Sequence, residues 1–528
     1  MQFRTGTKKS LMIIAIAAQL SHIAITAVGQ TSGFSITPVI KRGDPVGDGG
    51  RFFDCDGCEG RVVGLHAFNN KGDVTIGADT TGSCFEGRFL ISGNLSIRLA
   101  DFCRQTPFGK FGILGSVNIN QQSQAAMLVA LPVEGRLDAA LFLHSAGQLS
   151  RIVQERDASP AGGIFKGCGF GQPAINNNGE VAFFACGEKD GFFFGDGVFK
   201  YSGGQISKVV VSDDPSPSGG TFLLNFIPAQ AVQMNDSGDV LFRAGINLGP
   251  TVKEKLGLFL AKQDAVKAIE IDGDAMPSGG KVTPDTFGFG DLNGRGEVVF
   301  AVGLTGAQTD SGIFLYSGDH ISKIMLQGEP TPIGGTFFTL SDSSFTLPRV
   351  NANGTVAFKI PVIGGNSSSA IFLASPQAMV KVVAVGDRLP TGETIRVIDT
   401  FALNDLGQVA FFAYGKKDKT RPLGVYTAAP LPPIINSIKL KHKKGALQLR
   451  VNGNAMITND TVIEINGVPV GALDYPSDFR VDGGFTTQVV SRDPRLEQLL
   501  SPGQTVQVTV FNSLTNLRSN PMSLTRSN

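Results

Sequence analysis

The chain has 528 residues, and its 46 Lys and Arg against 45 Asp and Glu give a formal net charge of +1. This balance excludes a strongly basic nucleic-acid binder and an acidic disordered tail. The length allows more than one domain and a large core. Gly and Phe are abundant, Trp is absent, and short apolar runs alternate with Gly-rich turns, which together predict an all-β protein.

Residues 1–29 are typical of an export signal. Basic side chains, the last of them Lys9, precede a short apolar run at 11–18, and small residues at 27–29 suit cleavage. The apolar run is shorter than a bilayer span, although a membrane anchor is the alternative interpretation. We therefore expect a secreted, periplasmic or cell-surface protein with no membrane span after the signal is removed.

A phrase of the form Asn-x-x-Gly, followed by alternating apolar residues, recurs along the chain. Its leading residues are Asn69, Asn120, Asn176, Asn235, Asn293, Asn351 and Asn404. The spacing of 51 to 59 residues is typical of propellers and related arrays. Asn bonds nearby backbone groups and Gly accepts a positive φ, so the phrase predicts a tight turn between two strands.

Each repeat contains three further pieces. They are a Gly-apolar-aromatic strand such as 197–199, a strand after a hairpin turn as in 201–210, and an acidic turn such as 273–280. Together with the strand before the Asn turn they give four short antiparallel strands, which is one propeller blade. We predict a seven-bladed β-propeller of four-stranded blades over residues 30–429.

The two ends of the array complement each other. The seventh repeat stops at Pro430, Pro432 and Pro433 before its fourth strand, whereas residues 34–44 resemble a fourth strand with no blade before it. We predict that residues 35–41 supply the missing strand of the last blade. This pairing would close the ring and remove two open sheet edges.

From residue 430 to residue 528 the pattern changes. Short strands are divided by turns such as Asn452-Gly453 and Pro502-Gly503, and the segment lacks Cys. This spacing predicts an immunoglobulin-like β-sandwich without an inter-sheet disulfide.

The repeated phrase resembles a family of exported bacterial tandem-repeat proteins known by the NxxGxxAF motif, over about residues 34–429. Five copies match closely, but the second departs at Ser123 and at 125–127, which leaves the geometry of that blade open. The resemblance implies a propeller and export, and no established activity. Residues 433–438 and 518–524 resemble IPT/TIG immunoglobulin-like modules, which implies adhesion or spacing.

Six cysteines in an exported chain predict disulfides. Cys168 and Cys186 lie on neighbouring strands of the third repeat and form the predicted pair. Four others lie in the first two repeats with their pairing open: Cys55, Cys58, Cys84 and Cys103. The first two have the spacing of a redox or zinc site, but no second such pair or His cluster accompanies them, so we expect no metal there.

One acidic residue recurs in the turns between repeats: Asp44, Asp157, Asp214, Asp274, Glu329 and Asp387. On the loop face of a propeller these side chains would suit Ca²⁺ or a cationic ligand. The alternative is an acid that accepts backbone N–H groups within its own turn, and repetition in nearly every blade favours this alternative.

Phe192 and Phe193, in an irregular segment, would form an exposed binding patch. The alternative is that they begin a strand and pack inward.

The sequence contains no nucleophile elbow, His-Glu-x-x-His motif or phosphate loop. We therefore expect an exported, monomeric binding or scaffold protein with an extracellular glycan or protein as partner. We expect no catalytic residue, no metal site and no cofactor, with Ca²⁺ as the one ion that the turn acids would suit. The alternative is a secreted polysaccharide hydrolase or lyase, which would need two or three acids and a basic partner in the central channel.

Overall fold

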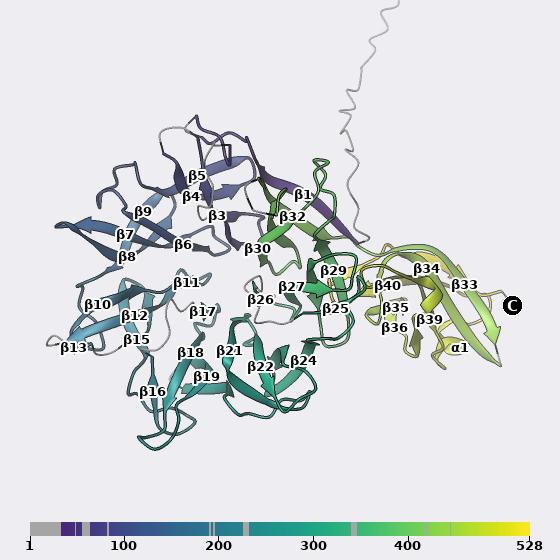
Figure 1. Ribbon diagram of the computed structural model, residues 1–528. Helices are drawn as coiled ribbons and strands as arrows, with labels where there is room; N and C mark the ends of the chain where they lie inside the picture. Colours follow the sequence, from purple (N-terminus) through teal and green to yellow (C-terminus); the bar gives the residue numbers. More distant parts are fainter. Residues whose placement is uncertain are drawn as a thin grey trace, which may run out of the picture.

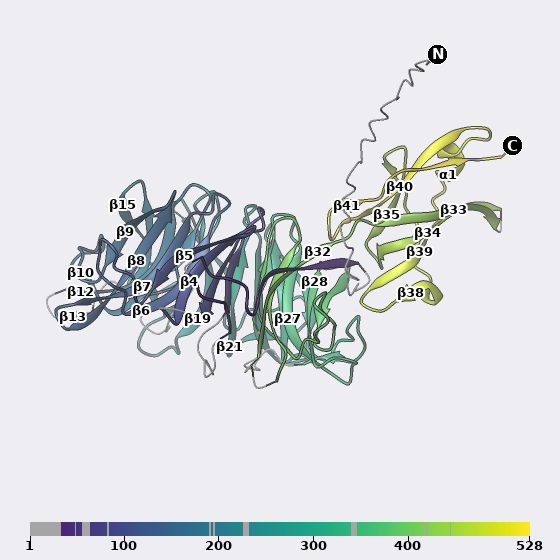
Figure 2. The same ribbon diagram turned by 90° about the horizontal axis from the view of Figure 1, so that it is seen from above.

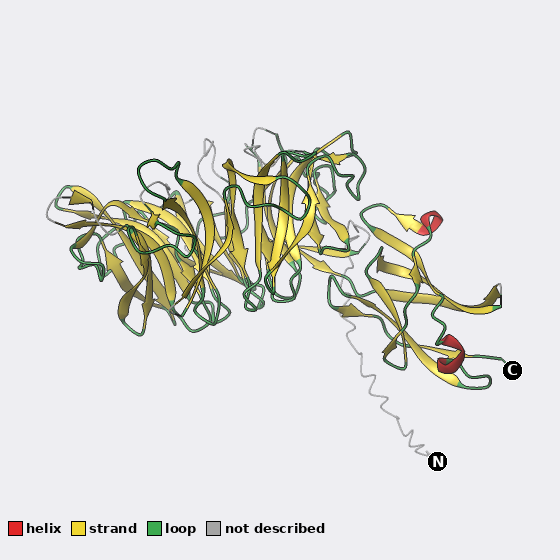
Figure 3. Cartoon of the chain, turned by 90° about the horizontal axis from the view of Figure 1, so that it is seen from below, coloured by secondary structure: helices red, strands yellow, loops and turns green. Residues whose placement is uncertain are grey.

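The computed structural model describes residues 33–527 except 48, 55–63, 82–83, 190–191, 194–195, 225–231, 264, 339–345, 418, 420 and 444. The predicted export signal lies outside this part. The regular secondary structure of the described chain is almost entirely strand (Figure 3), with one 3-10 turn, η1 (Ser477–Phe479), and one short helix, α1 (Leu496–Leu499). No helix among the described residues has the length and apolar character needed to cross a membrane.

Within the described residues, seven antiparallel sheets follow one another around a ring (Figure 1). The first two contain β2 (Gly64–Phe68), β3 (Val74–Asp79), β4 (Glu86–Ser92) and β5 (Leu95–Asp101), then β6 (Ile113–Ile119), β7 (Ala125–Val133), β8 (Arg136–Ser145) and β9 (Gln148–Gln154). The third contains β10 (Ile164–Phe170), β11 (Ala174–Ile175), β12 (Val181–Lys189), β13 (Phe192–Phe193), β14 (Gly197–Ser202) and β15 (Gln205–Val211). The fourth contains β16 (Thr221–Leu223), β17 (Gln233–Met234), β18 (Val240–Asn247), β19 (Lys255–Lys262) and β20 (Ala265–Ile271).

The remaining three sheets continue the ring. The fifth contains β21 (Lys281–Leu292), β22 (Val298–Thr305), β23 (Ser311–Ser317) and β24 (His320–Leu326). The sixth contains β25 (Thr336–Phe337), β26 (Thr346–Val350), β27 (Val356–Ile363), β28 (Ser369–Ala374) and β29 (Met379–Ala384). The seventh contains β30 (Val397–Leu403), β31 (Val409–Tyr414), β32 (Pro422–Pro430) and β1 (Phe34–Lys41). The all-β prediction and the four-strand sheets are confirmed, and the arrangement is propeller-like.

The seventh sheet joins the two ends of the repeat array. β1 runs antiparallel to β32, with Ile36 opposite Ala428. The segment 35–41, predicted to complete the last sheet, lies within β1. Phe34 and Ile36 are buried in the core beside this sheet, so the pairing is supported by packing as well as by backbone hydrogen bonds.

The Asn turns explain why the repeated phrase needs Asn and Gly. Asn176 Oδ1 accepts the backbone N–H groups of Asn178 and Glu180, both at 3.0 Å, and Gly179 has a φ of 76°. Asn176 Nδ2 donates to the carbonyl oxygen of Asn235 in the next sheet, at 3.2 Å. The side chain therefore closes its own turn and links two sheets at once.

The same inter-sheet bond recurs around the ring. It joins Asn69 to Asn120, Asn120 to Asn176, Asn235 to Asn293, Asn293 to Asn351, and Asn404 back to Asn69. We call these residues the asparagine belt. In the second repeat Ser123 takes the place of Gly with a φ of 63°, so that turn keeps the common geometry.

Aromatic side chains pair across neighbouring strands within the sheets. Phe242 stacks on Phe259 with ring centroids 5.7 Å apart, and Phe183 stacks on Phe199 at 5.9 Å. A Cβ on Gly312 would lie 2.9 Å from the Phe314 ring. Since the ring folds back over this position, Gly is needed two residues before the aromatic side chain.

The C-terminal unit consists of two sheets with one shared core. One sheet contains β33 (Ile434–Lys443), β34 (Ala446–Ile457), β37 (Leu473–Asp474), β38 (Arg480–Val481) and β39 (Phe485–Ser491). The other contains β35 (Thr461–Ile465), β36 (Val468–Pro469), β40 (Thr505–Asn512), β41 (Leu517–Arg518) and β42 (Met522–Thr525).

This unit packs against the outer side of the ring near the sixth and seventh sheets (Figure 2). Phe485 contacts Phe34 edge to face, with centroids 6.4 Å apart. The backbone N–H of Lys381 donates to Gly483 O at 2.9 Å, and Gly483 N–H donates to Pro332 O at 3.0 Å. Apolar and main-chain contacts together fix the unit on the ring.

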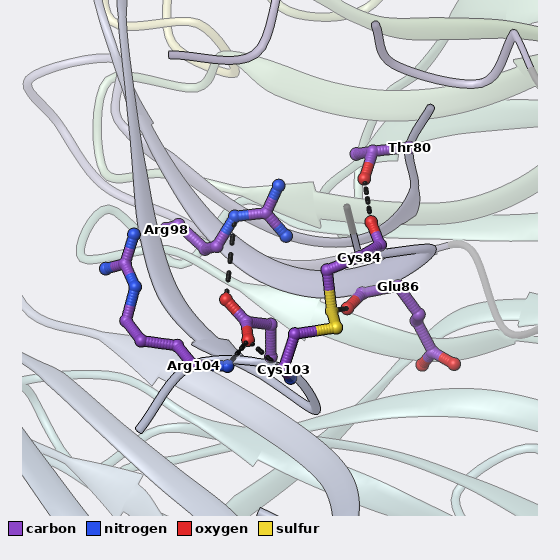
Figure 4. The surroundings of a disulfide bond; sticks show 7 residues. Thr80, Cys84, Glu86, Arg98, Cys103 and Arg104 are labelled. Carbon is purple, nitrogen blue, oxygen red and sulfur yellow. Dashed lines mark hydrogen bonds and ion pairs between the residues drawn. A yellow bond between two sulfur atoms is a disulfide. The ribbon is translucent and has the colours of Figure 1, made fainter. Parts of the chain in front are cut away.

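Cys84 and Cys103 form a disulfide, which settles one of the pairings that the sequence left open (Figure 4). Their sulfur atoms lie near Asp101, but because they are bonded to each other they are not free to bind a metal. Cys186 is disulfide-bonded, while Cys55, Cys58 and the side chain of Cys168 lie outside the described residues. The predicted Cys168–Cys186 bond therefore stays a prediction.

Candidate functional site

The recurrent turn acids have the same local role in each repeat. Each carboxylate accepts the backbone N–H of the residue three positions earlier, at 2.7 to 2.9 Å: Asp44, Asp157, Asp214, Asp274, Glu329 and Asp387. Lysines on the preceding strand also pair with several of them, for example Lys208 with Asp214 at 2.9 Å. These contacts match the turn interpretation of the acids.

The structure does not gather the turn acids into one cluster. Each belongs to a different inter-sheet turn, and the one close group of three metal-ligating residue types in the described part is that of Cys84, Asp101 and Cys103. Phe192 and Phe193 form β13 beside β12, and their side chains lie outside the described residues.

A cavity of about 210 Å³ lies on the axis of the ring, because all seven sheets contribute to its lining. One residue from each repeat reaches it, at the position two before the belt Asn: Ala67, Asn118, Ala174, Gln233, Asp291, Arg349 and Ala402. His66, Ser116 and Gln172 add further polar groups. We call this the channel site.

Asp291 and Arg349 form the charged part of the channel site. Arg349 Nη1 lies 3.8 Å from Asp291 Oδ1, and the side chains are 27% and 15% exposed, respectively. The backbone N–H of Val350 donates to Asp291 Oδ2 at 3.0 Å. Burial raises the pKa of Asp291 above its ordinary value, and the Arg349 charge and backbone N–H groups offset only part of this rise.

His66 supplies a neutral imidazole. Burial, and to a smaller extent the nearby charge of Arg88, lower its pKa from 6.5 to about 3. Arg88 is fixed by hydrogen bonds to the carbonyl oxygens of Gly115 at 2.7 Å and Leu114 at 2.6 Å. A neutral imidazole offers one donor and one acceptor, so His66 serves hydrogen bonding rather than charge at neutral pH.

Two buried polar atoms at the channel site have no hydrogen-bond partner among the described residues. They are His66 Nε2 and Ser116 Oγ. Both residues also line a second cavity of about 370 Å³, between the first and second sheets. A buried polar atom without a partner is unfavourable, so a polar group in the cavity would gain from bonding these two atoms.

None of the predicted ligand-binding residues lines the channel site, and sequence reasoning missed the residues that do. A signal was present, because the repeats agree at the belt Asn and differ two positions earlier. In every repeat the variable position is the last but one residue of the strand that ends immediately before the belt Asn.

A family model matches residues 30–365, more than half of the chain. The chain belongs to the family of unknown function DUF7453. No protein with a curated description matches the sequence.

Several solved structures resemble this chain at low identity. The β-propeller domain of the Trilobed protease from Pyrococcus furiosus is 9% identical with a TM-score of 0.40, over 70% of this chain and 98% of that chain. An uncharacterized protein from Listeria monocytogenes EGD-e is 11% identical with a TM-score of 0.37, over 69% and 95%. The polysaccharide lyase Uly1 is 8% identical with a TM-score of 0.37, over 75% and 99%. At these values the likenesses carry no inference about the activity of this chain.

Proposed function

We propose that this chain is an exported binding protein that holds a small, neutral, hydroxyl-rich ligand, such as the terminal sugar of a glycan, in the channel site. The observation that carries the proposal is the lining of the cavity, where paired charges, amides, a neutral imidazole and a hydroxyl converge from six sheets. Ligand pockets combine an enclosed shape with a few convergent polar groups.

The chemistry of the lining favours a neutral ligand. The charges of Asp291 and Arg349 compensate each other, and the amides of Gln172 and Gln233 both donate and accept hydrogen bonds. The volume of about 210 Å³ lies below the roughly 300–1,000 Å³ of pockets for drug-sized ligands, so one small unit fits.

The architectural part of the proposal is a seven-bladed propeller of the exported NxxGxxAF type, closed by β1, with an IPT/TIG-like immunoglobulin-fold module over residues 430–528. Seven sheets and the pairing of β1 with β32 support the blade count, and two sheets around one core support the module. The Cys84–Cys103 disulfide fits an oxidising compartment and therefore export. The protein acts as a monomer, and the module serves as a spacer or attachment unit.

A secreted polysaccharide hydrolase or lyase is the second candidate. The raised pKa of Asp291 favours it, since acid catalysts need such a shift. Glycoside hydrolysis usually needs two carboxylates, however, and Asp291 is the single carboxylate among the described residues that line the channel site. Binding without turnover therefore fits the lining better.

Calorimetric titration of the purified mature chain with a panel of mono- and disaccharides tests the proposal. Arg349→Gln and Asp291→Asn should each weaken binding at least tenfold, a loss of about 1.4 kcal/mol, because each removes a charged hydrogen-bonding group. Asp214→Asn is the matched control, since it changes a turn acid outside the cavity and should bind as the wild type does.

Two results would contradict the binding proposal. One is a wild-type chain that binds no saccharide of the panel, and the other is a loss of affinity in Asp214→Asn as large as in the channel variants. Release of shortened sugars or unsaturated products by the wild type, abolished in Asp291→Asn, would establish the enzyme instead.

A further inference from the structure

The β33–β34 hairpin carries a concentration of positive charge. Figure 1 shows its tip directed away from the ring. The sequence between residues 433 and 459 contains no Asp or Glu, but it contains Lys439, Lys441, Lys443, Lys444 and Arg450. This local imbalance differs from the near-neutral chain as a whole.

Three of these lysines form a regular row. Lys439, Lys441 and Lys443 alternate along β33 with Ile438 and Leu440, which pack on the core of the unit. The lysines are exposed and share the opposite face, about 6.8 Å apart along the strand. We call this row the lysine stripe.

Neighbouring carboxylates do not neutralise the lysine stripe. Across the sheet, Lys439 lies opposite Arg450, Arg450 lies opposite Val490, and Val490 lies opposite Asp474. Asp474 is therefore three strands away from Lys439. At about 4.8 Å per strand, that carboxylate is roughly 14 Å distant, which exceeds the Debye length of about 8 Å in physiological salt. Asp474 is also bonded to Arg492 at 2.9 Å.

Two further acids of the unit, Glu464 and Asp493, have arginine partners of their own. Arg518 bonds Glu464 at 2.7 Å, and Arg495 bonds Asp493 at 2.6 Å. Among the described residues the structure records no ion pair for the three stripe lysines. The unit therefore presents one uncompensated line of ammonium groups on its surface.

We propose that the lysine stripe binds an anionic polysaccharide and attaches the protein to a surface that carries this polymer. A straight row of evenly spaced cations complements a linear polymer with repeated negative charges. Stable attachment to a membrane usually needs an apolar or lipid contact in addition to the lysines. The one exposed large hydrophobic residue on β33 is Ile434, at the end of the strand opposite the hairpin tip.

Retention of the full chain on immobilised dextran sulfate tests this inference, with uncharged dextran as the matched matrix. Replacing Lys439, Lys441 and Lys443 together by Gln should lower the affinity roughly tenfold at about 50 mM salt, because three counterion-releasing contacts are lost. The triple Lys→Arg variant should retain binding, since the charge is preserved.

A second triple variant serves as the control for net charge. It replaces three lysines of the ring by Gln: Lys71, Lys110 and Lys253. All three lysines are exposed and have no ion pair among the described residues. This variant should bind dextran sulfate as the wild type does. An equal loss in both triple variants would overturn the inference, because the effect would then follow net charge alone.

Three other results would overturn the inference as well. They are equal retention of the wild type on dextran and dextran sulfate, binding to vesicles with about 30% phosphatidylserine but not to the polymer, and self-association of the stripe variant with unchanged polymer binding. The last result would show that the lysines protect the β33 edge from pairing with another strand. The channel variants leave the stripe intact, so failure of either proposal is visible separately.

Discussion

Replacing Asn235 by Ala should destabilise the ring much more than replacing an exposed Asn of such a turn. Asn235 is 5% exposed, and its two ends serve different purposes. The Oδ1 atom closes the local turn, while Nδ2 reaches the next sheet. The substitution therefore tests whether the asparagine belt stabilises the ring or whether each Asn only closes its own turn.

The magnitude follows from four hydrogen bonds. Asn235 Oδ1 accepts the N–H groups of Ser237 at 3.1 Å and Asp239 at 3.0 Å. Its Nδ2 donates to Asn293 O at 3.2 Å and to Asp239 Oδ2 at 3.1 Å. At about 1 kcal/mol for each lost bond, and with buried groups left without partners, the free energy of unfolding should fall by about 3–4 kcal/mol.

Urea unfolding followed by far-UV circular dichroism measures this loss, since the chain has no Trp for fluorescence. Asn178→Ala is the control, because that side chain makes one exposed hydrogen bond, to Asp236 O at 2.8 Å. It should cost less than about 0.5 kcal/mol. A loss in Asn235→Ala no larger than in Asn178→Ala would refute the role of the belt.

Further predictions concern the disulfide, the packing of the two units, and pH. Removing the Cys84–Cys103 bond by substituting both residues with Ala should lower the free energy of unfolding by about 3 kcal/mol in urea, because a loop of 19 residues is released; an unchanged midpoint would contradict this. Phe485→Ala removes packing on Phe34 and should lower the free energy of unfolding by about 3 kcal/mol. It should also speed the proteolytic separation of the C-terminal unit from the ring. An unchanged cleavage rate would show that the main-chain contacts alone hold the unit on the ring. Burial raises the pKa of Glu270 from 4.5 to about 8, so the folded chain holds a proton that the unfolded chain releases, and stability should fall as pH rises through that window. Glu270→Gln should flatten this fall in urea midpoints between about pH 5 and pH 8, and an equal slope in both chains would contradict the shift.

The turns and strands of each repeat could be predicted from the sequence, because the residue types of the repeated phrase favour one backbone geometry. The Asn and Gly of each phrase predict a turn, and the structure has that turn even where Ser123 replaces Gly. The missing fourth strand of the last repeat indicated a partner at 35–41, and β1 pairs with β32. The Cys84–Cys103 bond could also have been predicted, since the two residues flank the β4–β5 hairpin, where Gly87 lies opposite Asp101.

The channel site was less accessible to sequence reasoning. Whether Asp291 faces the axis depends on which strand of each sheet is innermost and on how the sheets close around the axis. The recurrent acids repeat because every sheet needs such a residue for its own turn, so their repetition does not indicate a ligand site. A carboxylate such as Asp214 that accepts a backbone N–H in each turn supports the fold without forming a common site.

The division between repeated and variable positions also gives the channel site an orientation. Two positions before the belt Asn, the fourth, fifth and sixth repeats carry Gln233, Asp291 and Arg349, whereas the seventh and first carry Ala402 and Ala67. The two charges of this position therefore lie on one side of the cavity, and the two repeats that follow contribute only small apolar side chains there. A ring built from near-identical repeats would bind equally from every direction, but this asymmetry lets a single ligand be held in one orientation. The function of the chain should accordingly be sought where its repeats differ.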